Sequence, residues 1–267
     1  MNLNVERILI IGLGLIGSSI AATAKSKGIK VTGFDLNVDT LKKAVDEKII
    51  DTKIDEIETI NSTDVDLIIL AVPPRKTLDL FKSLNYLWNT TTTITDTASV
   101  KNHIKLDGVN NIVLSHPIAG SDKSGIDALD NNLFIDKKNI LCNPFDASDE
   151  HIKKVKNFWV NALNMRTEMM TVAEHDLIFA MTSHLPHLVS YALIDSIRLS
   201  NSNVKDNSGG GLKEFLRLSG SNPEMWKDIF ILNRVDLIKA LAGMQVSLNN
   251  LLELITETKQ IPDIFSH

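Results

Sequence analysis

The stretch Arg7 to Lys27, RILIIGLGLIGSSIAATAKSK, decides the fold of this chain. It starts with a short apolar, β-branched run, Ile8 to Ile11, of the kind that forms a strand buried on both faces of a parallel sheet. Gly12, Gly14 and Gly17 follow in G-x-G-x-x-G spacing, and an alanine-rich helical pattern comes next. A strand, a glycine turn and a helix in this order predict a phosphate site, because the helix N-terminus presents free N–H groups and its dipole to an anion.

A second predicted strand, 30–35, ends in an acid and indicates which ligand the turn binds. Asp35 follows Gly17 at close to the ~20 residues expected of a carboxylate that binds the ribose hydroxyls of a dinucleotide. An ordinary strand-to-helix corner would not need this acid. A carboxylate repels a 2′-phosphate, and Leu36-Asn37-Val38 supplies no arginine to counter it, so NAD is favoured over NADP. The turn residues expected to contact NAD are Gly12, Leu13, Gly14, Leu15, Ile16 and Gly17.

Two further predicted strands end at the same crevice. The clearest strand, 64–72, stops at Pro73-Pro74, which cannot continue a central strand, so the chain leaves at the strand's carboxyl end. The β-branched run 91–95 leads out to Asp96 in the same way. Since ligands bind at the carboxyl ends of strands in such sheets, Val72, Pro73 and Asp96 are also expected to contact the cofactor. The alternation of strands and helices predicts an α/β fold with a doubly wound, mostly parallel Rossmann-type sheet.

Length and composition bound the remaining possibilities. The chain has 267 residues, 43% of them apolar, which is enough for two domains with sizeable cores. The net charge of -5 argues against a nucleic-acid surface, which needs a clustered basic face. The single cysteine, Cys142, fits a reducing compartment and lies in an apolar run as a buried structural thiol. We expect no membrane segment, because no apolar run approaches ~20 residues, and no signal peptide, hence a cytoplasmic protein.

The two halves of the chain differ in pattern. Residues 1–170 are expected to form the dinucleotide-binding domain, and residues 171–267 an all-helical domain, since strands fade after Asn143 apart from a piece at 166–169. The last long predicted helix carries an a/d seam in steps of four and three residues, which indicates either domain core or a dimer interface. Its positions are Leu237, Leu241, Met244, Leu248, Leu251 and Ile255.

His116 is the leading candidate for catalysis. It follows the predicted strand 111–115, which should end at the crevice, and Pro117 fixes the backbone that presents it. A lone histidine is more often structural, but this position favours a functional one. Ser99, at the start of a predicted helix after Asp96, fits an N-cap, a hydrogen bond to a substrate hydroxyl, or both.

The second half supplies further polar candidates. His184 and His187 share one helical face beside Pro186, and His175-Asp176 is similar to the metal-binding HD pair of phosphohydrolases. No additional ligands stand at recognisable spacing, so we expect no metal, and the two histidines are expected to line an anionic pocket. Arg217 fits either a surface salt bridge or a partner for a substrate carboxylate, which its planar fork binds well.

Taken together, these residues resemble a known family, the bacterial prephenate/arogenate dehydrogenases of tyrosine biosynthesis. The resemblance runs from Arg7 to about Asn233. Ala98 stands where the family often has glycine, and Leu216 where threonine is common; neither change removes a catalytic group. The motifs that carry it are Gly12 to Gly17 (GLGLIG), Thr95 to Lys101 (TDTASVK), Ser115 to Ser121 (SHPIAGS), Ser183 to His187 (SHLPH), Gly210 to Arg217 (GGLKEFLR) and Asn222 to Trp226 (NPEMW).

The resemblance implies oxidative decarboxylation of prephenate to 4-hydroxyphenylpyruvate and CO2, with NAD+ as the oxidant. It implies that His116 polarises the ring hydroxyl with help from Ser99, and that Arg217 binds the ring carboxylate. It also implies that His184 and His187 face the pyruvyl side chain and that Ser121 contacts the substrate. Family members are homodimers built through the helical half, which suits the seam.

Two alternatives remain open from the sequence. The chain could prefer arogenate, which carries an ammonium group where prephenate has a ketone, although by resemblance His187 favours prephenate. It could instead be a non-catalytic NAD-sensing protein on the same fold. A sensor would not need His116, Ser99 and Arg217 together, so their joint presence disfavours it.

Overall fold

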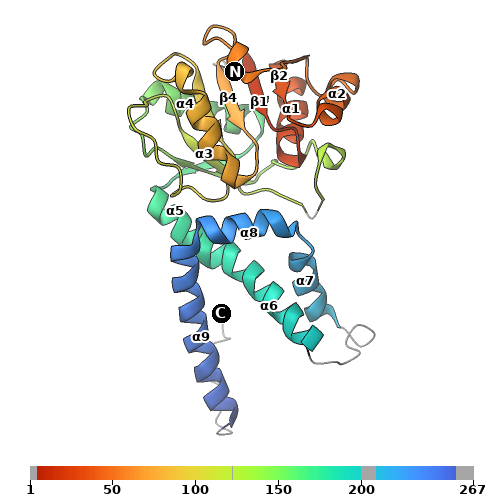
Figure 1. Cartoon of the computed structure of the whole chain (residues 1–267), viewed down its shortest axis with the longest axis vertical. Coiled ribbons are helices and arrows are strands. Elements are labelled where there is room, and N and C mark those ends of the chain that lie inside the picture. The colour runs from red at the N-terminus through yellow and green to blue at the C-terminus, as the bar shows by residue number, and fades with distance from the viewer. Residues whose placement is uncertain (1–4, 122, 200–208, 257–267) are drawn as a thin grey trace.

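The computed structural model describes residues 5–121, 123–199 and 209–256. Figure 1 shows a sheet-containing part at the top and a group of helices below it, joined through α5. The predicted class, a Rossmann-type parallel sheet followed by helices, is confirmed. The strands are β1 (Arg7–Ile11), β2 (Lys30–Phe34), β3 (Thr52–Lys53), β4 (Leu67–Leu70), β5 (Thr93–Asp96), β6 (Leu114–Pro117), β7 (Lys138–Cys142) and β8 (Arg166–Met169).

The main sheet has five strands in the order β3-β2-β1-β4-β5, and all its pairs are parallel. Successive residues of the central strand β1 point to opposite faces, so Ile8 and Ile10 join one core cluster, and Leu9 and Ile11 join another. This double burial explains why β1 and β4 read as continuous apolar runs. Helices α1 and α2 cover the first face, and α3 covers the second.

The helices of the sheet-containing part connect these strands. Their bounds are α1 (Leu15–Ser26), α2 (Val38–Asp46), α3 (Pro74–Ser83) and α4 (Asp149–Asn157). A π-helical segment, Phe158–Ala162, continues α4, and short 3-10 helices lie at Ile57–Thr59, Asn85–Leu87 and Ile126–Ala128.

The strand predicted at 111–115 is displaced and leaves the main sheet. A single parallel bridge, Ile94 to Ile112, continues the main sheet, and the chain then enters β6, which belongs to a second sheet of order β6-β7-β8. Strands β6 and β7 are antiparallel, and β7 and β8 are parallel. The carboxyl end of β6 nevertheless stays at the same edge as that of β5, because the bridge is parallel.

The helical part consists of α5 (Val172–Phe179), α6 (Leu185–Leu199), α7 (Gly210–Ser219), α8 (Pro223–Leu232) and α9 (Arg234–Thr256). Helix α5 begins with a capping box between Thr171 and Glu174. A π-helical segment, Ala180–His184, joins α5 to α6. Pro186 follows directly, and its missing N–H and bulky ring account for the loosened register there.

Residues 172–199 form one continuous helix that is long and apolar enough to cross a membrane, by length and composition. This differs from the sequence-based expectation, which considered only uninterrupted apolar runs. Its most apolar window has a mean hydropathy of 1.4, and 28% of that window is buried. The buried members include His175, Asp176 and His184, whose partners lie in other elements.

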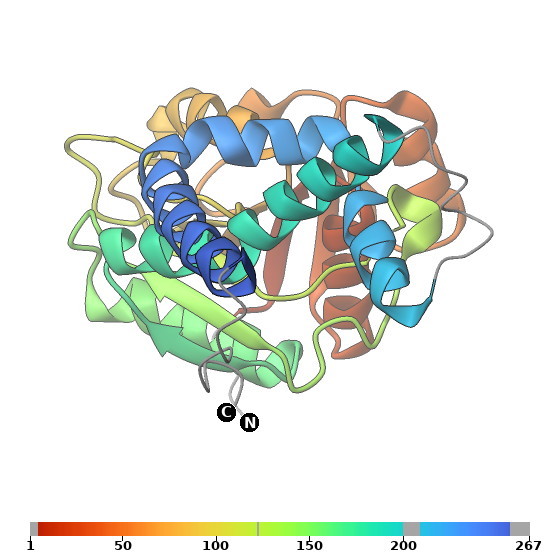
Figure 2. The ribbon, with the colours of Figure 1, turned by 90° about the horizontal axis from the view of Figure 1, so that it is seen from below.

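The seam on α9 divides into two parts. Leu237, Leu241 and Met244 pack in a small core cluster against the 172–199 helix. Leu248 and Ile255, farther along, expose 51% and 65% of their surface. Figure 1 shows α6, α8 and α9 below the sheet-containing part, with the lower end of α9 standing away from the other helices, and Figure 2 shows the same helices from below, in front of the sheet.

Candidate active site

The turn between β1 and α1 has two positions that only glycine fits. Gly12 has a φ of +95°, and a Cβ there would lie 2.4 Å from the carbonyl oxygen of Ala71. A Cβ on Gly17 would lie 1.8 Å from the carbonyl oxygen of Gly12. Gly14 differs: its φ is -69°, and nothing lies within 4 Å of its Cβ position. The open side of Gly14, at the uncapped N-terminus of α1, fits a pyrophosphate bound by the first N–H groups of the helix.

Asp35 stands at the end of β2 beside this turn. Its Oδ2 accepts a hydrogen bond of 2.7 Å from the N–H of Leu13, and its Oδ1 accepts one of 2.8 Å from the N–H of Asn37. The carboxylate is half-buried, and the neighbouring Leu36 exposes 89% of its surface. A fixed acid beside an exposed apolar side chain fits the adenosine end of a dinucleotide. Val72, the next predicted contact, lies against Gly12, and the exposed Pro73 precedes α3.

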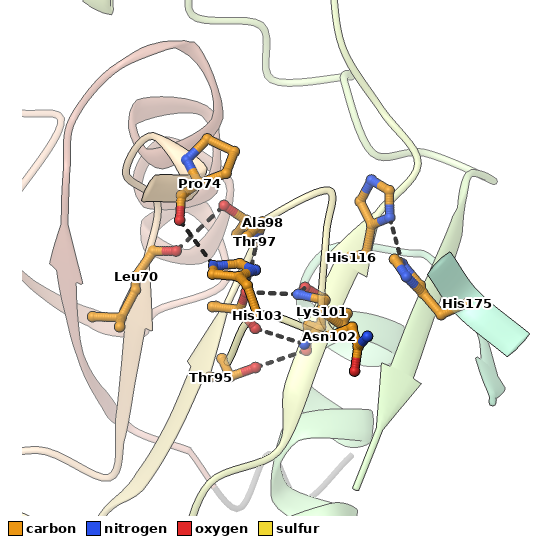
Figure 3. Close-up of polar contacts among 12 residues, drawn as sticks. Leu70, Pro74, Thr95, Thr97, Ala98, Lys101, Asn102, His103, His116 and His175 are labelled. Atoms are coloured by element: carbon orange, nitrogen blue, oxygen red, sulfur yellow. Dashed lines mark hydrogen bonds and ion pairs between the residues drawn. The ribbon is translucent and has the colours of Figure 1, made fainter. Parts of the chain in front are cut away.

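Asp96 does not reach the crevice, contrary to the prediction that it contacts the cofactor. It is fully buried, and its Oδ1 accepts a hydrogen bond of 3.0 Å from the N–H of Ser115. Its Oδ2 accepts bonds from the N–H of Ala98 and, at 2.6 Å, from Nζ of the equally buried Lys101. Lys101 also donates to the carbonyl oxygen of Ser115. This ion pair therefore ties the loop after β5 to β6, and Figure 3 shows its lysine next to His116.

His116 lies within β6, opposite Ile140 of β7, and not directly after a strand as the sequence predicts. Its side chain is 9% exposed, and its Nδ1 lies 2.8 Å from Nε2 of His175. Phe179 packs its ring on both imidazoles, with centroids at 4.7 and 4.6 Å. Burial lowers the pKa of His116 well below 6.5, and positive charge on His175, Lys101 or His184 acts in the same direction. The ring is therefore neutral at pH 7.

His175 and Asp176 of α5 continue this contact inward. His175 Nδ1 lies 2.7 Å from Asp176 Oδ1, and neither side chain has appreciable exposure. Asp176 also accepts hydrogen bonds from the N–H groups of Lys101, at 2.9 Å, and Asn102, at 2.8 Å. Burial alone would raise the pKa of Asp176, but the bonds from His175, Asn102 and Lys101 lower it overall. Burial lowers the pKa of His175.

Ser99 lies on the loop between β5 and β6 and does not cap a helix there. The chain from 97 to 101 is irregular, so the predicted N-cap role is wrong. The residues on either side are fixed: Ala98 through Asp96, and Lys101 through both Asp96 and Asp176. Ser99 is half-buried between them. A rigid loop of this kind can hold a hydroxyl in place without a helix.

The two histidines of the SHLPH motif have different environments. His184 is fully buried, and its Nδ1 accepts a hydrogen bond of 3.1 Å from Asn233. Burial lowers the pKa of His184 to about 4. His187 is half-buried and stacks on Trp226, with centroids 3.5 Å apart. Its Nδ1 donates to the carbonyl oxygen of Ser183 at 2.9 Å, which leaves Nε2 as an acceptor, and burial lowers its pKa.

Arg217 lies on α7 with a 63% exposed side chain and pairs with Glu214 at 3.0 Å. This pair is the surface salt bridge that the sequence allows as one of two possible roles for Arg217. Arg217 is also close enough to His187 for its charge to lower the pKa of that histidine further. Ser121 is exposed on the loop that follows β6. An exposed arginine that uses only Nε in its bond to Glu214 within the described part of the chain retains N–H groups that can bind a substrate carboxylate.

The structure places the predicted catalytic and substrate-binding residues in two groups and adds some residues that the prediction missed. His116 and Ser99 lie at the carboxyl ends of strands beside the dinucleotide turn, and His187 with Arg217 forms a separate group on the helices. Among the described residues, no group of three or more His, Cys, Asp and Glu side chains has metal-site geometry. The residues missed are Lys101, His175, Asp176 and Trp226.

Of those, the His175-Asp176 pair had a local signal, because the two residues are adjacent near the start of a predicted helix, and Lys101 and Trp226 each end a motif that carries the resemblance. From the sequence, the His175-Asp176 pair is considered only as a possible metal site and is not connected to His116. The bond from His175 to His116 joins residues 59 positions apart, which local spacing does not predict.

Comparison with known proteins now adds an independent observation. Residues 20–166 match the family model of the prephenate dehydrogenase nucleotide-binding domain, and residues 171–267 match that of the prephenate dehydrogenase dimerization domain. A cyclohexadienyl dehydrogenase of Zymomonas mobilis is 32% identical over 88% of this chain and 84% of that protein. A prephenate dehydrogenase of Bacillus subtilis is 30% identical over 88% of this chain and 66% of its own length.

Solved structures of prephenate and arogenate dehydrogenases are also similar to this chain. Prephenate dehydrogenase of Aquifex aeolicus, in complex with hydroxyphenyl propionate and NAD+, has a TM-score of 0.88 and 34% identity, over 97% of this chain and 93% of that one. An arogenate dehydrogenase of Synechocystis has a TM-score of 0.79 and 27% identity, over 97% and 95%. Each of these proteins shares both the sheet-containing part and the helical part with this chain.

Proposed function

The chain belongs to the prephenate dehydrogenase family, and from that premise we propose that it converts prephenate and NAD+ into 4-hydroxyphenylpyruvate, CO2 and NADH. One observation carries the assignment of the chemistry. His116 is a neutral imidazole held through one nitrogen, at the same edge of the sheet as the dinucleotide turn. Such a group can accept a proton from a hydroxyl while hydride leaves the carbon that bears it.

The reaction removes hydride from the ring carbon that carries the 4-hydroxyl. His116 Nε2 accepts the hydroxyl proton, so the oxygen develops carbonyl character as the hydride departs. The ring carboxylate then leaves as CO2, its bonding electrons pass into the ring, and the aromatic oxygen takes the proton back from His116. The histidine therefore ends each turnover as it began. Ser99, on its fixed loop, is proposed to hold the same hydroxyl in line with His116.

The cofactor is NAD, which accepts the hydride when bound. We assign its pyrophosphate to the turn from Gly12 to Gly17 and its ribose to Asp35, supported by the open side of Gly14 and the fixed carboxylate. Val72 and Pro73 complete the wall of this site. Asp96 is buried, so we assign it no contact with the cofactor. Through its ion pair with Lys101 it fixes the loop that follows β5.

The substrate carboxylates are assigned to the helical part. We propose that Arg217 binds the ring carboxylate and that His187, with Nε2 as its acceptor nitrogen and Trp226 behind it, borders the pyruvyl side chain. Ser121 is proposed to contact the substrate from the loop after β6. His184 is buried against Asn233, so we assign it a supporting role behind Trp226 and not the direct contact expected from the sequence.

We propose that two domains, 1–170 and 171–267, divide these tasks, and that the second one forms a homodimer. The division is supported by the end of β8 at Met169 and the start of α5 at Val172. The dimer is supported by apolar side chains that α9 exposes, a patch typical of interaction surfaces. They are Val235, Ile238, Val246, Leu248, Leu252 and Ile255. The membership of a biosynthetic family and the buried free thiol of Cys142 support a cytoplasmic location.

The dimer is tested by sedimentation of the wild type and of Leu252→Glu, which places a charge in the exposed patch. We expect a dimer for the wild type and a monomer for the variant. Glu253→Gln, on the neighbouring exposed position, serves as the control and should stay dimeric. A wild type that is monomeric at micromolar concentration would contradict the proposal.

The activity itself is tested by following NADH absorbance with prephenate and with arogenate side by side. The Synechocystis relative is an arogenate dehydrogenase, so this second substrate is a specific alternative. We expect a higher kcat/KM for prephenate. A preference for arogenate would reassign the substrate, and no NADH from either one would contradict the proposed function.

A further inference from the structure

The inner contacts of His116 form a chain of hydrogen bonds with a defined direction. Figure 3 shows His175 on one ring nitrogen of His116 and the other ring nitrogen facing away from it. Behind His175 lies Asp176, so the order is carboxylate, imidazole, imidazole. The separation is 2.7 Å for the first contact and 2.8 Å for the second, and both are hydrogen-bond distances.

The direction of this chain starts at Asp176. Its two oxygens accept the N–H groups of Lys101 and Asn102, which can only donate, and its lowered pKa keeps it ionised. An ionised carboxylate has no proton to give, so His175 Nδ1 must carry the hydrogen of the bond between them. Since His175 is neutral, its Nε2 is then a lone-pair acceptor.

The acceptor on His175 determines the tautomer of His116. An acceptor at His175 Nε2 requires a hydrogen on His116 Nδ1. The neutral ring of His116 then has its lone pair on Nε2, the nitrogen that faces away from His175. We propose that His175 and Asp176 are positioning residues, which hold the proton of His116 on Nδ1 so that Nε2 is available to accept the proton of the substrate hydroxyl.

The chain also fits the proton balance of the reaction. The proton that His116 takes from the hydroxyl returns to the aromatic oxygen, so no route to solvent is needed. Asp176 offers none, because it is buried and both of its carboxylate oxygens accept hydrogen bonds from protein groups. While His116 briefly carries a positive charge, the carboxylate stabilises it through His175, much as a buried acid supports the histidine of a catalytic triad. Phe179 covers both rings and limits their rotation.

This inference rests on the proposed function for the identity of the substrate, but its first test needs no substrate. The tautomer of a histidine is read from the nitrogen chemical shifts of a protein with 15N-labelled imidazoles. We expect His116 in the unliganded wild type to be protonated at Nδ1 and bare at Nε2. A wild type protonated at Nε2 would overturn the inference, whether or not prephenate is turned over.

Variants of His175 provide the second test. His175→Leu removes the acceptor, so we expect His116 to move to the Nε2–H tautomer and kcat to fall roughly a hundredfold, with KM for prephenate and NAD+ within about threefold of the wild type. His175→Gln offers a side-chain carbonyl in place of the imidazole nitrogen. It should restore the Nδ1–H tautomer and bring kcat to within about tenfold of the wild type.

A matched control separates positioning from stability. His151 is a buried imidazole that hydrogen-bonds a side chain, Thr93 at 2.7 Å, in a different part of the fold. His151→Leu should leave the His116 tautomer and kcat unchanged. A folded His175→Leu variant with unchanged tautomer, or with kcat within about threefold of the wild type, would overturn the inference. If the wild type shows the expected tautomer but does not oxidise prephenate, the positioning role stands and the proposed substrate fails.

Discussion

We propose that the carboxylate of Asp35 selects NAD over NADP. In Asp35→Ala the ribose loses an acceptor and a 2′-phosphate loses the charge that repels it, so NAD binding should weaken and the preference over NADP should narrow. The N–H of Leu13 also loses its partner. The measurement is kcat/KM with each cofactor, with Asp39→Ala on the exposed start of α2 as control. An unchanged NAD/NADP ratio would show that Asp35 has no part in this choice.

The proposed role of Arg217 depends on the planar shape of its guanidinium group. Arg217→Lys keeps the charge but replaces a planar fork with a point charge, so prephenate use should be impaired far more than NAD binding. Loss of a charge-assisted hydrogen bond costs roughly 1.5–3 kcal/mol, about ten- to a hundredfold in kcat/KM.

Steady-state kinetics with prephenate tests this prediction, and Arg198→Lys, an exposed arginine on α6, is the control. Unaltered prephenate kinetics in Arg217→Lys would leave only the surface pair with Glu214 for this residue.

Two glycines of the turn between β1 and α1, Gly17 and Gly14, should respond differently to a change to alanine. Gly17→Ala places a Cβ 1.8 Å from the carbonyl oxygen of Gly12, so strand and helix must move apart and both stability and NAD binding should fall. In Gly14→Ala the added Cβ has no protein atom within 4 Å, so this variant should keep the thermal stability of the wild type and lose only NAD affinity. Thermal unfolding and NAD titration of the two variants test this contrast. Equal stability of the two would contradict it.

Some elements followed directly from the sequence, and others did not. The strand, glycine turn and helix at 7–27 are predictable because local pattern alone requires them. The displacement of β6 into a second sheet is not, because it depends on pairing with β7, more than twenty positions away. The loop at Ser99 resembles a helix start locally, but Asp96 and Asp176 hold its N–H groups in another geometry.

At the scale of the whole molecule, buried histidines should make the protein sensitive to acid. The pKa values of His103, His116, His151, His175, His184 and His187 are all lowered, chiefly by burial. Below about pH 6.5 the unfolded chain binds protons that the folded chain does not, so stability present at pH 7 is lost as the pH falls. His184, with a folded pKa of about 4, contributes about 2 kcal/mol of this loss at pH 5.

Chemical denaturation at pH 7 and pH 5 measures the difference. We expect a lower free energy of unfolding at pH 5, with the loss beginning near pH 6.5. Equal free energies at the two pH values would show that these histidines are not held neutral in the fold.

The candidate site spans the whole molecule, which limits what the sequence could predict. His116, Ser99, Asp35 and the glycines could be proposed from the sequence because each lies in or close to the carboxyl end of a recognisable strand. The contacts of His116 with His175, and of Asp176 with Lys101, join the sheet-containing part to the helical part, and no local pattern encodes them. His184 illustrates the converse: its motif predicts a ligand contact, but packing against Asn233 buries it.

The dependence of kcat on pH for the wild type and His116→Asn tests directly whether His116 is the base. His116 accepts a proton only when neutral, and its pKa is lowered well below 6.5, so wild-type kcat should hold at pH 7 and fall on the acidic side at a pH well below 6.5. His116→Asn should still bind NAD and prephenate, lose roughly 10²–10⁴ in kcat, and show no acidic limb. Near-full kcat in the variant, or the same acidic limb, would contradict the assignment of His116 as the base.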